Sequence, residues 1–286
     1  MTIFVFTSVF TDIIQNVKIF DPKPLSQEIE REILNNLNER PEKRNRSLAI
    51  LEIGKDPSSE KFIKIKLSLC EKLGVKCDVF TLDEQSPDRE IFAQVERIFK
   101  DENVAGGIIQ LPLPRESLYE VLNLIPLEKD IDVISTEGKR RFYSGDFSAL
   151  SPVVMAFNNF ILKNQVNMSG LKTKIIGNGD LVGRPVSFFL NKNGADVDIL
   201  TDYNGTDKLE CQLLVLCAGV PNLVKGENIS AGCNIVDFGS SVVNEKCVGD
   251  LDINSDLEHL GCISKSPGGM GPLVVRCLLL NWSKRA

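Results

Sequence analysis

The sequence predicts an α/β protein of two domains, each built on a parallel sheet, and three observations support this fold class. The chain has 286 residues, and at roughly 150 residues per domain this length favours two domains. Short apolar segments alternate with segments of helical spacing, which is typical of parallel strands joined by crossover helices. In the second half, a turn with three glycines joins an apolar segment to a helical one, as in a dinucleotide-binding sheet.

The first half of the chain contains a β-α-β-α-β series. Aliphatic residues predict a strand over 48–53, ended by Gly54, and a helix over 58–73 follows an Asp-Pro start signal. A short strand over 79–82 and a helix over 87–100 come next, and the segment VAGGIIQLPLP predicts a strand with a proline-rich exit. This order predicts a parallel sheet covered by helices.

A second series begins with a helix over roughly 152–163. Strands are predicted at LKTKIIG, DVDIL, QLLVLCAG, NIVDFG and CIS, with a helix at VGRPVSFFLNKNG. Strands this short, spaced by connectors, indicate an open doubly wound sheet. The last apolar segment, GPLVVRCLLLNW, predicts a helix that could pack back on the first domain. The expected domains are therefore 1–150 with the helix at about 270–286, and 151–269.

Composition and charge exclude several classes of protein. Apolar residues make up 43% of the chain and charged residues 25%, which is ordinary for a globular protein. The net charge of −6 argues against a nucleic-acid surface and a polybasic membrane anchor. The start, MTIFVFTSVF, lacks a positive leading region, so we expect a buried or edge strand rather than a signal peptide. No segment has the length of a membrane helix, and we expect a cytoplasmic protein.

The cysteines and the single histidine favour no metal site. None of the eight scattered cysteines has CxxC spacing, and several lie in apolar segments, so we expect buried reduced thiols. His259 lies in the polar segment SDLEHLG and is expected at the surface. A zinc site and a Ser-His-Asp or Cys-His mechanism therefore have little support.

The glycine turn in IIGNGDLVGRP is the first candidate binding site. Gly177, Gly179 and Gly183 form G-x-G-x-x-x-G between a predicted strand and a predicted helix. Glycines allow a sharp turn and let a pyrophosphate approach the helix N-terminus, where free N–H groups favour an anion. Asp202, after the next strand, could bond a ribose hydroxyl. The alternatives are a plain turn without ligand and, for Asp202, a turn residue in TDYNGTD.

Several motifs in a fixed order are more specific than this turn. They are GKDPSSEKFIKIK, IIQLPLP, PLEKDIDV, GNGDLVGRP, GDLD and SPGGMGP, from about residue 17 to 283. With them the chain resembles the bifunctional methylenetetrahydrofolate dehydrogenase and methenyltetrahydrofolate cyclohydrolase family. The resemblance implies an α/β substrate domain, a Rossmann-type domain, a C-terminal helix that returns to the first domain, and a homodimer. It also implies oxidation of the methylene bridge of 5,10-methylenetetrahydrofolate, with hydride going to a nicotinamide, and hydrolysis of the methenyl product to 10-formyltetrahydrofolate.

The resemblance assigns roles to residues of the first domain and of the last loop. The family's Tyr-x-x-x-Lys falls on Phe62 and Lys66, and Lys66 matches the catalytic lysine. Gln110 matches the glutamine that contacts this lysine, and Asp132 matches the aspartate that holds the pterin ring. Pro267, Gly268 and Gly269 match the loop near folate and nicotinamide.

Three segments depart from the family pattern. Phe62 can stack on a pterin but lacks the tyrosine hydroxyl, which puts the cyclohydrolase step in question more than the dehydrogenase step. Phe62, Ile65 and Leu69 could instead form a core stripe. Val133 replaces a glycine, and SALSPVVM replaces Pro-Cys-Thr-Pro-x-Gly. The alternatives are therefore a diverged, non-catalytic folate- or dinucleotide-binding homologue, and a dehydrogenase with another small substrate.

The identity of the nicotinamide cofactor is open between NAD and NADP. NADP-using members of the family carry Arg-Ser where Asn178 and Gly179 stand, and His-Ser where Thr201 and Asp202 stand. The missing arginine and the added carboxylate favour NAD slightly, whereas the family as a whole favours NADP. Arg184 or Lys208 could still supply a phosphate contact. The expected cofactor-binding residues are Gly177, Asn178, Gly179, Asp180, Gly183, Arg184, Thr201 and Asp202.

Overall fold

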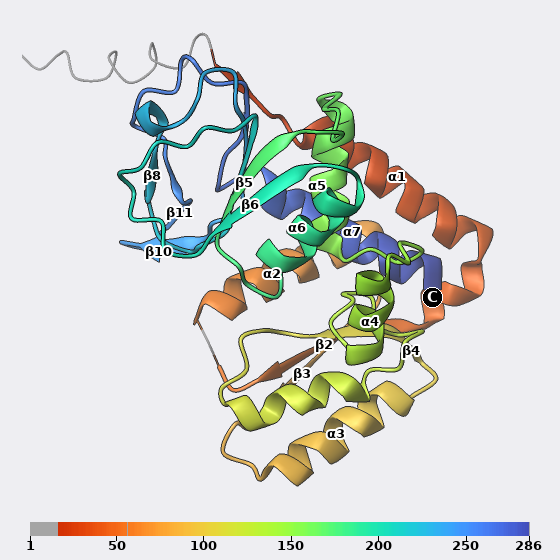
Figure 1. Cartoon of the computed structure of the whole chain (residues 1–286). Coiled ribbons are helices and arrows are strands. Elements are labelled where there is room, and N and C mark those ends of the chain that lie inside the picture. Colours follow the sequence, from red (N-terminus) through yellow and green to blue (C-terminus); the bar gives the residue numbers. More distant parts are fainter. Residues whose placement is uncertain (1–16, 56, 286) are drawn as a thin grey trace, which may run out of the picture. The chain divides into compact units, whose positions relative to one another are not determined.

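The computed structural model describes residues 17–55 and 57–285, which form two compact units (Figure 1). The first unit comprises Lys23–Ala156 and the chain from Pro272 onward. The second comprises Phe157–Gly271 and the segment that precedes Lys23. The strand expected at MTIFVFTSVF lies outside the described residues.

The first unit is built on a three-stranded parallel sheet. Its order is β3-β2-β4, with β2 (Ser47–Ile53) in the centre, β3 (Cys77–Leu82) on one side and β4 (Val104–Ile109) on the other. Two crossover helices connect the strands, α2 (Pro57–Leu73) and α3 (Asp88–Lys100). All seven residues of β2 are buried, as a central parallel strand requires. The β-α-β-α-β series and the parallel sheet are confirmed, with boundaries shifted by one or two residues.

Two further helices of this unit lie side by side, α1 (Lys23–Glu39) and α7 (Met270–Arg285) (Figure 1). A buried carboxylate joins them, because Glu30 of α1 accepts a bond of 2.7 Å from Arg276 of α7. Trp282, which is fully buried, donates its Nε1–H to the carbonyl oxygen of Ser47 in β2 at 3.3 Å. The prediction that the last helix returns to the first domain is confirmed. The polar α1 was not predicted.

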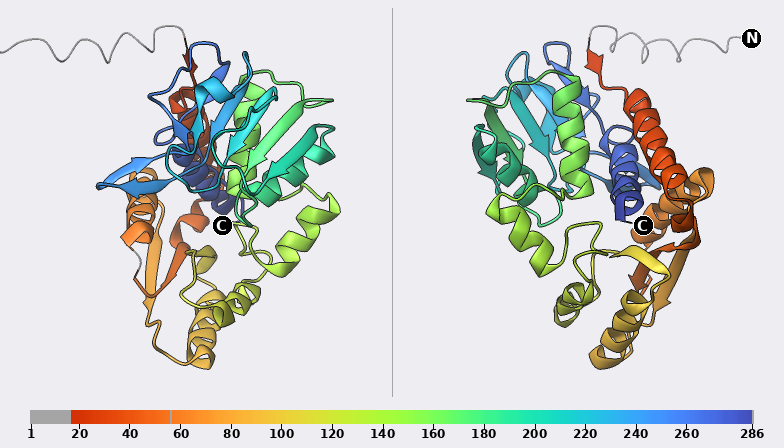
Figure 2. Two further views of the ribbon diagram at one scale, coloured as in Figure 1. Left: turned by 60° about the vertical axis from the view of Figure 1, so that its left-hand side comes forward. Right: turned by 90° about the vertical axis from the view of Figure 1, so that its right-hand side faces the viewer.

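The second unit is built on a six-stranded parallel sheet of order β1-β13-β9-β7-β5-β6. Helix α6 joins β5 to β6, and α5 lies along one face of the sheet (Figure 2). The doubly wound order is confirmed, because the chain moves from β5 to β6 on one side and then to β7 on the other. The bounds are β1 (Lys18–Ile19), α5 (Pro152–Lys163), β5 (Lys172–Ile176), α6 (Gly183–Lys192), β6 (Asp196–Leu200), β7 (Leu213–Leu216), β9 (Asn234–Asp237) and β13 (Cys262–Ser264).

The N-terminal strand β1 belongs to the second unit, which differs from the expected start of the first domain at residue 1. Lys18 and Ile19 pair with β13, and the Phe20 N–H donates to the carbonyl oxygen of Ile263 at 2.8 Å. The Phe20 ring also meets Phe160 of α5 edge to face, with centroids 5.1 Å apart. Backbone pairing and aromatic packing therefore attach this segment to the second sheet.

The remaining elements are short connectors that the sequence analysis did not predict. Helix α4 has a cap at each end: Ser135 accepts from the Gly138 N–H, and Gly145 adopts the left-handed conformation at φ 93°. These elements are η1 (Pro41–Asn45), η2 (Glu116–Leu124), α4 (Thr136–Ser144), β8 (Val224–Lys225), η3 (Gly226–Asn228), β10 (Ser241–Val243), β11 (Lys246–Val248) and β12 (Leu251–Asp252).

All eight cysteines carry free thiols, and five of them are buried, which confirms the expectation for most of the set. Cys247 is exposed, since it lies on the β10–β11 hairpin rather than in a core. His259 is half-buried, with Nε2 3.0 Å from the carbonyl oxygen of Ile229. Within residues 17–55 and 57–285, no helix is both long and apolar enough to cross a membrane, and no cluster of acidic, cysteine or histidine side chains is arranged to hold a metal.

Candidate active site

The first unit gathers three of the expected residues at the carboxyl edge of its sheet. Gln110 directly follows β4, and its backbone N–H donates to the carbonyl oxygen of Leu51 at 2.7 Å. The segment containing Asp132 approaches the same strand, because the Gly107 N–H donates to the carbonyl oxygen of Lys129 at 3.0 Å. Lys66 lies on α2, the helix that follows the central strand.

Lys66 and Gln110 are in direct contact. The Lys66 Nζ donates to the Oε1 of Gln110 at 2.7 Å, and the Gln110 Nε2 donates to the carbonyl oxygen of Leu111 at 3.0 Å. The second bond fixes the orientation of the amide, so that its oxygen faces the lysine. The predicted contact between the residues at these positions is thus present.

The segment PLEKDIDV places Asp132 by means of its neighbours. Lys129 is buried and donates to the main-chain carbonyls of Phe99 and Asp101 at 2.7 and 2.8 Å, at the end of α3. Asp130 is buried and accepts from the N–H groups of Ile134 and Ser135 at 3.1 and 3.0 Å. Both charged groups are therefore occupied by hydrogen bonds within the first unit. Asp132 stays partly accessible.

The charges of Lys66 and Asp132 influence each other. Burial lowers the pKa of Lys66, and the neighbouring Asp132 carboxylate opposes that shift. Burial raises the pKa of Asp132 to about 6, while the Lys66 charge opposes it. Both side chains are thus moved toward neutral pH, the range in which a group can give and take protons.

Phe62 and Val133 depart from the family pattern without disturbing this arrangement. The Phe62 side chain is 38% exposed and Ile65 is 51% exposed, so the alternative of a core stripe is wrong, since only Leu69 is buried. Phe62 lies one helical turn before Lys66, where its ring is free to meet a ligand. Val133 has φ 58°, which is the left-handed region that a glycine adopts easily. The backbone conformation therefore suits the family's glycine, although a valine occupies it.

The second unit places the glycine turn where its sheet changes direction. The turn follows β5, which lies between β6 and β7, and the Gly177 N–H donates to the carbonyl oxygen of Leu200 at 3.1 Å. In open α/β sheets, ligands bind outside the carboxyl ends of the strands at this switch point. Thr201 and Asp202 follow Leu200 directly and are exposed beside the turn.

The space around the three glycines of the turn differs from one position to the next. Gly177 has φ 106°, and a Cβ there would strike the main chain of Cys217. A Cβ on Gly183 would collide with the carbonyl oxygen of Gly177. A Cβ on Gly179 would meet no atom within 4 Å. Two glycines are therefore required by packing, whereas the third leaves open, exposed backbone that a ligand can approach.

The charged residues around the turn differ in their availability. Arg184 lies in the first turn of α6 and pairs with Asp180 at 2.7 Å, and both side chains are more than half exposed. Asn178 is exposed as well. The Lys208 ammonium instead donates to the carbonyl oxygen of Glu227 at 2.7 Å. Of the two cations considered for a phosphate, Arg184 is the one on the glycine-turn helix.

Sequence reasoning missed two residues that fix the main chain around the glycine turn. Cys217, at the end of β7, donates its thiol to the carbonyl oxygen of Gly177 at 3.4 Å. Asp250 is fully buried, and its Oδ2 accepts from the N–H groups of Ala218 and Gly219 at 2.7 and 3.1 Å. This carboxylate fixes the loop after β7. The only signal in the sequence was the segment GDLD, which says nothing about burial.

The loop Pro267–Gly269 connects β13 to α7. Gly268 has φ 98°, and the Gly269 N–H donates to the carbonyl oxygen of Lys265 at 2.9 Å. The loop thus leaves the same carboxyl edge of the six-stranded sheet as the glycine turn. The two lie on different strands of that sheet, because β9 and β7 separate β13 from β5.

Comparison with known proteins covers both halves of the chain. The family model "Tetrahydrofolate dehydrogenase/cyclohydrolase, catalytic domain" matches residues 20–132. The model "Tetrahydrofolate dehydrogenase/cyclohydrolase, NAD(P)-binding domain" matches residues 152–286.

Relatives match over nearly their whole length. The chain is 31% identical over 274 residues to the bifunctional protein FolD of Aquifex aeolicus, covering 93% of this chain and 94% of that one. It is 33% identical over 271 residues to the bifunctional protein FolD of Mycoplasmopsis synoviae, covering 91% and 94%. The crystal structure of the bifunctional enzyme FolD from Campylobacter jejuni is 28% identical, with a TM-score of 0.85 and coverage of 94% and 98%.

Proposed function

The chain belongs to the tetrahydrofolate dehydrogenase/cyclohydrolase family, and from that premise we propose how its residues carry out the two reactions. It oxidises 5,10-methylenetetrahydrofolate to the methenyl form with a nicotinamide dinucleotide, and then hydrolyses the methenyl form to 10-formyltetrahydrofolate. The observation that carries the assignment of residues is the contact of Lys66 with Gln110, next to the charge of Asp132.

The doubt about the cyclohydrolase step and the alternative of a non-catalytic homologue are not borne out. Both family domains are matched, and relatives described as bifunctional align over more than 90% of the chain. The changes at Phe62 and Val133 also leave the Lys66–Gln110 pair intact. A different small substrate on the same plan has no observation in its favour.

We assign the proton transfers of the hydrolysis to Lys66. Water that attacks the methenyl carbon must lose a proton as the new C–O bond forms, and a neutral amine can take it. The C–N5 bond then breaks, N5 takes up the remaining hydroxyl proton, and the formyl group stays on N10. Burial lowers the pKa of Lys66, which makes that neutral form accessible. Gln110 accepts one N–H of the lysine at 2.7 Å and so directs the nitrogen lone pair away from itself.

We assign substrate positioning to Asp132 and Phe62. An ionised carboxylate can accept two N–H bonds from the edge of a pterin ring. Asp132 is partly accessible, while its neighbours Lys129 and Asp130 are occupied by the fold. The exposed ring of Phe62 offers a flat apolar surface to the face of the pterin. Aligned in this way, the methylene carbon can give up its hydride without any proton transfer by the protein.

We place the cofactor at the glycine turn, where the residues fit a dinucleotide. When bound, the nicotinamide accepts a hydride. The open backbone at Gly179 and the N-terminus of α6 suit the pyrophosphate, and Asp202 suits a ribose hydroxyl. The Asp202 carboxylate would repel a 2′-phosphate, while Arg184 already pairs with Asp180. We therefore propose NAD over NADP.

The first experiment follows the absorbance of reduced nicotinamide in the purified protein with methylenetetrahydrofolate, offering NAD and NADP in parallel. We expect turnover with both and a higher kcat/KM with NAD. A second recording, at a wavelength where the methenyl product absorbs, shows whether that product accumulates after oxidation or is removed by hydrolysis. Preference for NADP would overturn the argument from Asp202, and no reduction by a folded protein would overturn the assignment.

The family resemblance supports a dimeric assembly. We propose a homodimer, which sedimentation at two concentrations tests directly: a single species of about 32 kDa would contradict it. We also propose a cytoplasmic location, and recovery of the protein in a membrane or secreted fraction would contradict that.

A further inference from the structure

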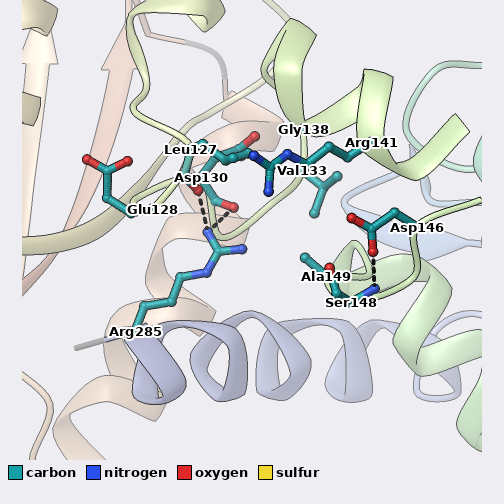
Figure 3. Close-up of a pocket in the computed structure, with 10 residues that line it drawn as sticks. All are labelled: Leu127, Glu128, Asp130, Val133, Gly138, Arg141, Asp146, Ser148, Ala149 and Arg285. Atoms are coloured by element: carbon teal, nitrogen blue, oxygen red, sulfur yellow. Dashed lines mark hydrogen bonds between the residues drawn. The ribbon is translucent and has the colours of Figure 1, made fainter. Parts of the chain in front are cut away.

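A pocket of about 430 Å³ in the first unit holds charged groups that already compensate one another (Figure 3). The carboxylates of Asp130 and Glu128 offset the charge of Arg285, and the Arg141 guanidinium offsets that of Asp146. Such a lining favours no particular ligand. The second unit instead contains two thiols in contact, and their chemistry is more specific.

Cys211 and Cys233 form a pair of thiols in the core of the second unit. Their sulfur atoms lie 3.6 Å apart, and the side chains are 6% and 0% exposed. Their other contacts are long, since the Cys211 Sγ lies 3.8 Å from the carbonyl oxygen of Leu209 and the Cys233 Sγ lies 3.4 Å from that of Asn234. The sulfurs of a disulfide are about 2.05 Å apart, so small rotations of the two side chains bring the pair within bonding distance.

The pair lies close to the surface at the amino edge of the sheet. Cys211 precedes β7, and Cys233 precedes the neighbouring strand β9. Glu210 and Gln212, on either side of Cys211, are exposed, and so is Gly232, next to Cys233. Each buried thiol is thus one residue away from exposed chain, which gives a small oxidant a short path to the sulfurs.

The two thiols differ in reactivity. The hydrogen bond with the Cys233 thiol lowers the pKa of Cys211, and Lys174 adds to this effect, while burial opposes it. Lys174 also pairs with Asp198 at 2.7 Å, which offsets part of its charge. The same hydrogen bond, together with burial, raises the pKa of Cys233. Because the thiolate is the nucleophile, we expect Cys211 to react first.

We propose that Cys211 and Cys233 are a reversible oxidation site at which a hydroperoxide converts the thiol pair into a disulfide. The Cys211 sulfur attacks one peroxide oxygen, the O–O bond breaks, and the proton of the Cys211 thiol goes to the leaving oxygen. Cys211 is then a sulfenic acid. The Cys233 sulfur attacks the Cys211 sulfur, and the sulfenic hydroxyl leaves as water with the proton of the Cys233 thiol. Two thiols are oxidised by two electrons, and the hydroperoxide is reduced to an alcohol and water.

The disulfide joins the amino ends of β7 and β9 and closes the chain between them into a loop. A closed loop restricts the unfolded chain and thereby stabilises the folded one. The glycine turn follows the carboxyl end of β5, at the opposite edge of the same parallel sheet. Oxidation should therefore raise the stability of the second unit.

The test treats the reduced full chain with hydrogen peroxide, blocks the remaining thiols in denaturant and maps tryptic peptides by mass spectrometry. We expect the peptide 209–225 to be joined to the peptide 226–246, with fragmentation placing the bond at Cys211 rather than Cys217. Dithiothreitol should separate the two peptides. The unfolding temperature of the cross-linked chain should exceed that of the reduced chain by about 5 °C or more.

Variants assign the two roles. In Cys233→Ser, the cross-link should be absent and dimedone should trap a sulfenic acid at Cys211. In Cys211→Ser, Cys233 should stay unmodified, because the attacking thiol is gone. Cys247→Ser is the matched control, since it removes an exposed thiol outside the pair and should leave the cross-link unchanged. Alanine variants at positions 211 and 233 replace the serine variants if those fail to fold.

Three outcomes would overturn the proposal. The first is that Cys211 and Cys233 remain free at a peroxide concentration that oxidises the exposed Cys247. The second is a cross-link confined to Cys70 and Cys77, whose thiols also share a hydrogen bond. The third is a cross-linked chain that unfolds at the same temperature as the reduced chain, or below it.

Discussion

The two candidate regions reach their function by different means. In the first unit, Lys66, Gln110 and Asp132 contribute side chains whose charge and orientation are set by burial and by two hydrogen bonds. In the second unit, the glycine turn contributes bare backbone at the end of β5. A side-chain site loses function when one group is removed, whereas a backbone site loses function when one group is added. The predictions below test this difference, from the largest effect to the smallest.

Removal of the lysine amine should have the largest effect. Lys66→Ala should lower the hydrolysis rate by about 10²–10⁴-fold, the usual contribution of a general base, while folate binding persists. The hydrolysis rate is measured as 10-formyl product in samples quenched at intervals, and folate affinity is measured by equilibrium binding. Lys64→Ala is the matched control, because Lys64 lies on the same helix with a side chain 75% exposed. Equal rates in the Lys66 variant and the wild type would remove the lysine from the mechanism.

Addition of one methyl group at Gly183 should damage the second unit. Its Cβ would collide with the carbonyl oxygen of Gly177, so Gly183→Ala should lower the free energy of unfolding by about 3 kcal/mol. Helix propensity alone would favour alanine by about 1 kcal/mol, so a net loss can only come from the collision. Urea unfolding monitors the change. A variant as stable as the wild type would show that the turn does not pack closely on the helix.

Acid should weaken folate binding through Asp132. Its pKa is raised to about 6, so the carboxylate is ionised above pH 6 and becomes protonated as the pH falls below it. Each pH unit below 6 should then raise the KM for folate about tenfold, with kcat less affected. Asp132→Asn should show a high KM without this pH dependence. Because the Lys66 charge lowers the pKa of Asp132, Lys66→Ala should move the rise in KM to higher pH. If the KM of that variant rises at the same pH as in the wild type, another group titrates.

A methyl group at Gly179 should affect the ligand and spare the fold. Since its Cβ meets no atom within 4 Å, Gly179→Ala should change the unfolding free energy by less than about 0.5 kcal/mol. The KM for the dinucleotide should rise about tenfold, because the methyl group stands where backbone meets pyrophosphate. The folate KM serves as the internal control. Unchanged cofactor kinetics would place the dinucleotide elsewhere.

Sequence patterns predicted the parallel sheets because buried strands are short continuous apolar segments and the helices between them have a clear helical period. The helix expected over 87–100 is an example, because its apolar residues at helical spacing, Ile91, Val95, Ile98 and Phe99, are all buried in α3. Helix α1 shows the same contrast, since Leu25, Ile29, Ile33 and Leu37 are buried at a spacing of four residues, but it was overlooked. The site residues came from motif resemblance, since a lysine among lysines carries no signal of its own. The burial of Asp250 and the pairing of β1 with β13 depend on contacts between distant segments, which local patterns do not show.

The smallest effect concerns Val133, a position of the first unit that the backbone conformation determines. Val133 has φ 58°, and this conformation costs an L-residue with a Cβ about 1–2 kcal/mol. Val133→Ala and Val133→Gly both remove the buried valine side chain, so their difference isolates the backbone. We expect the glycine variant to be more stable than the alanine variant by about 1 kcal/mol in urea unfolding. This reverses the usual order, in which alanine exceeds glycine by about 0.5–1 kcal/mol within regular structure. The usual order here would mean that the turn that carries Asp132 does not hold residue 133 in the left-handed region, and that side chains alone determine the first unit's site.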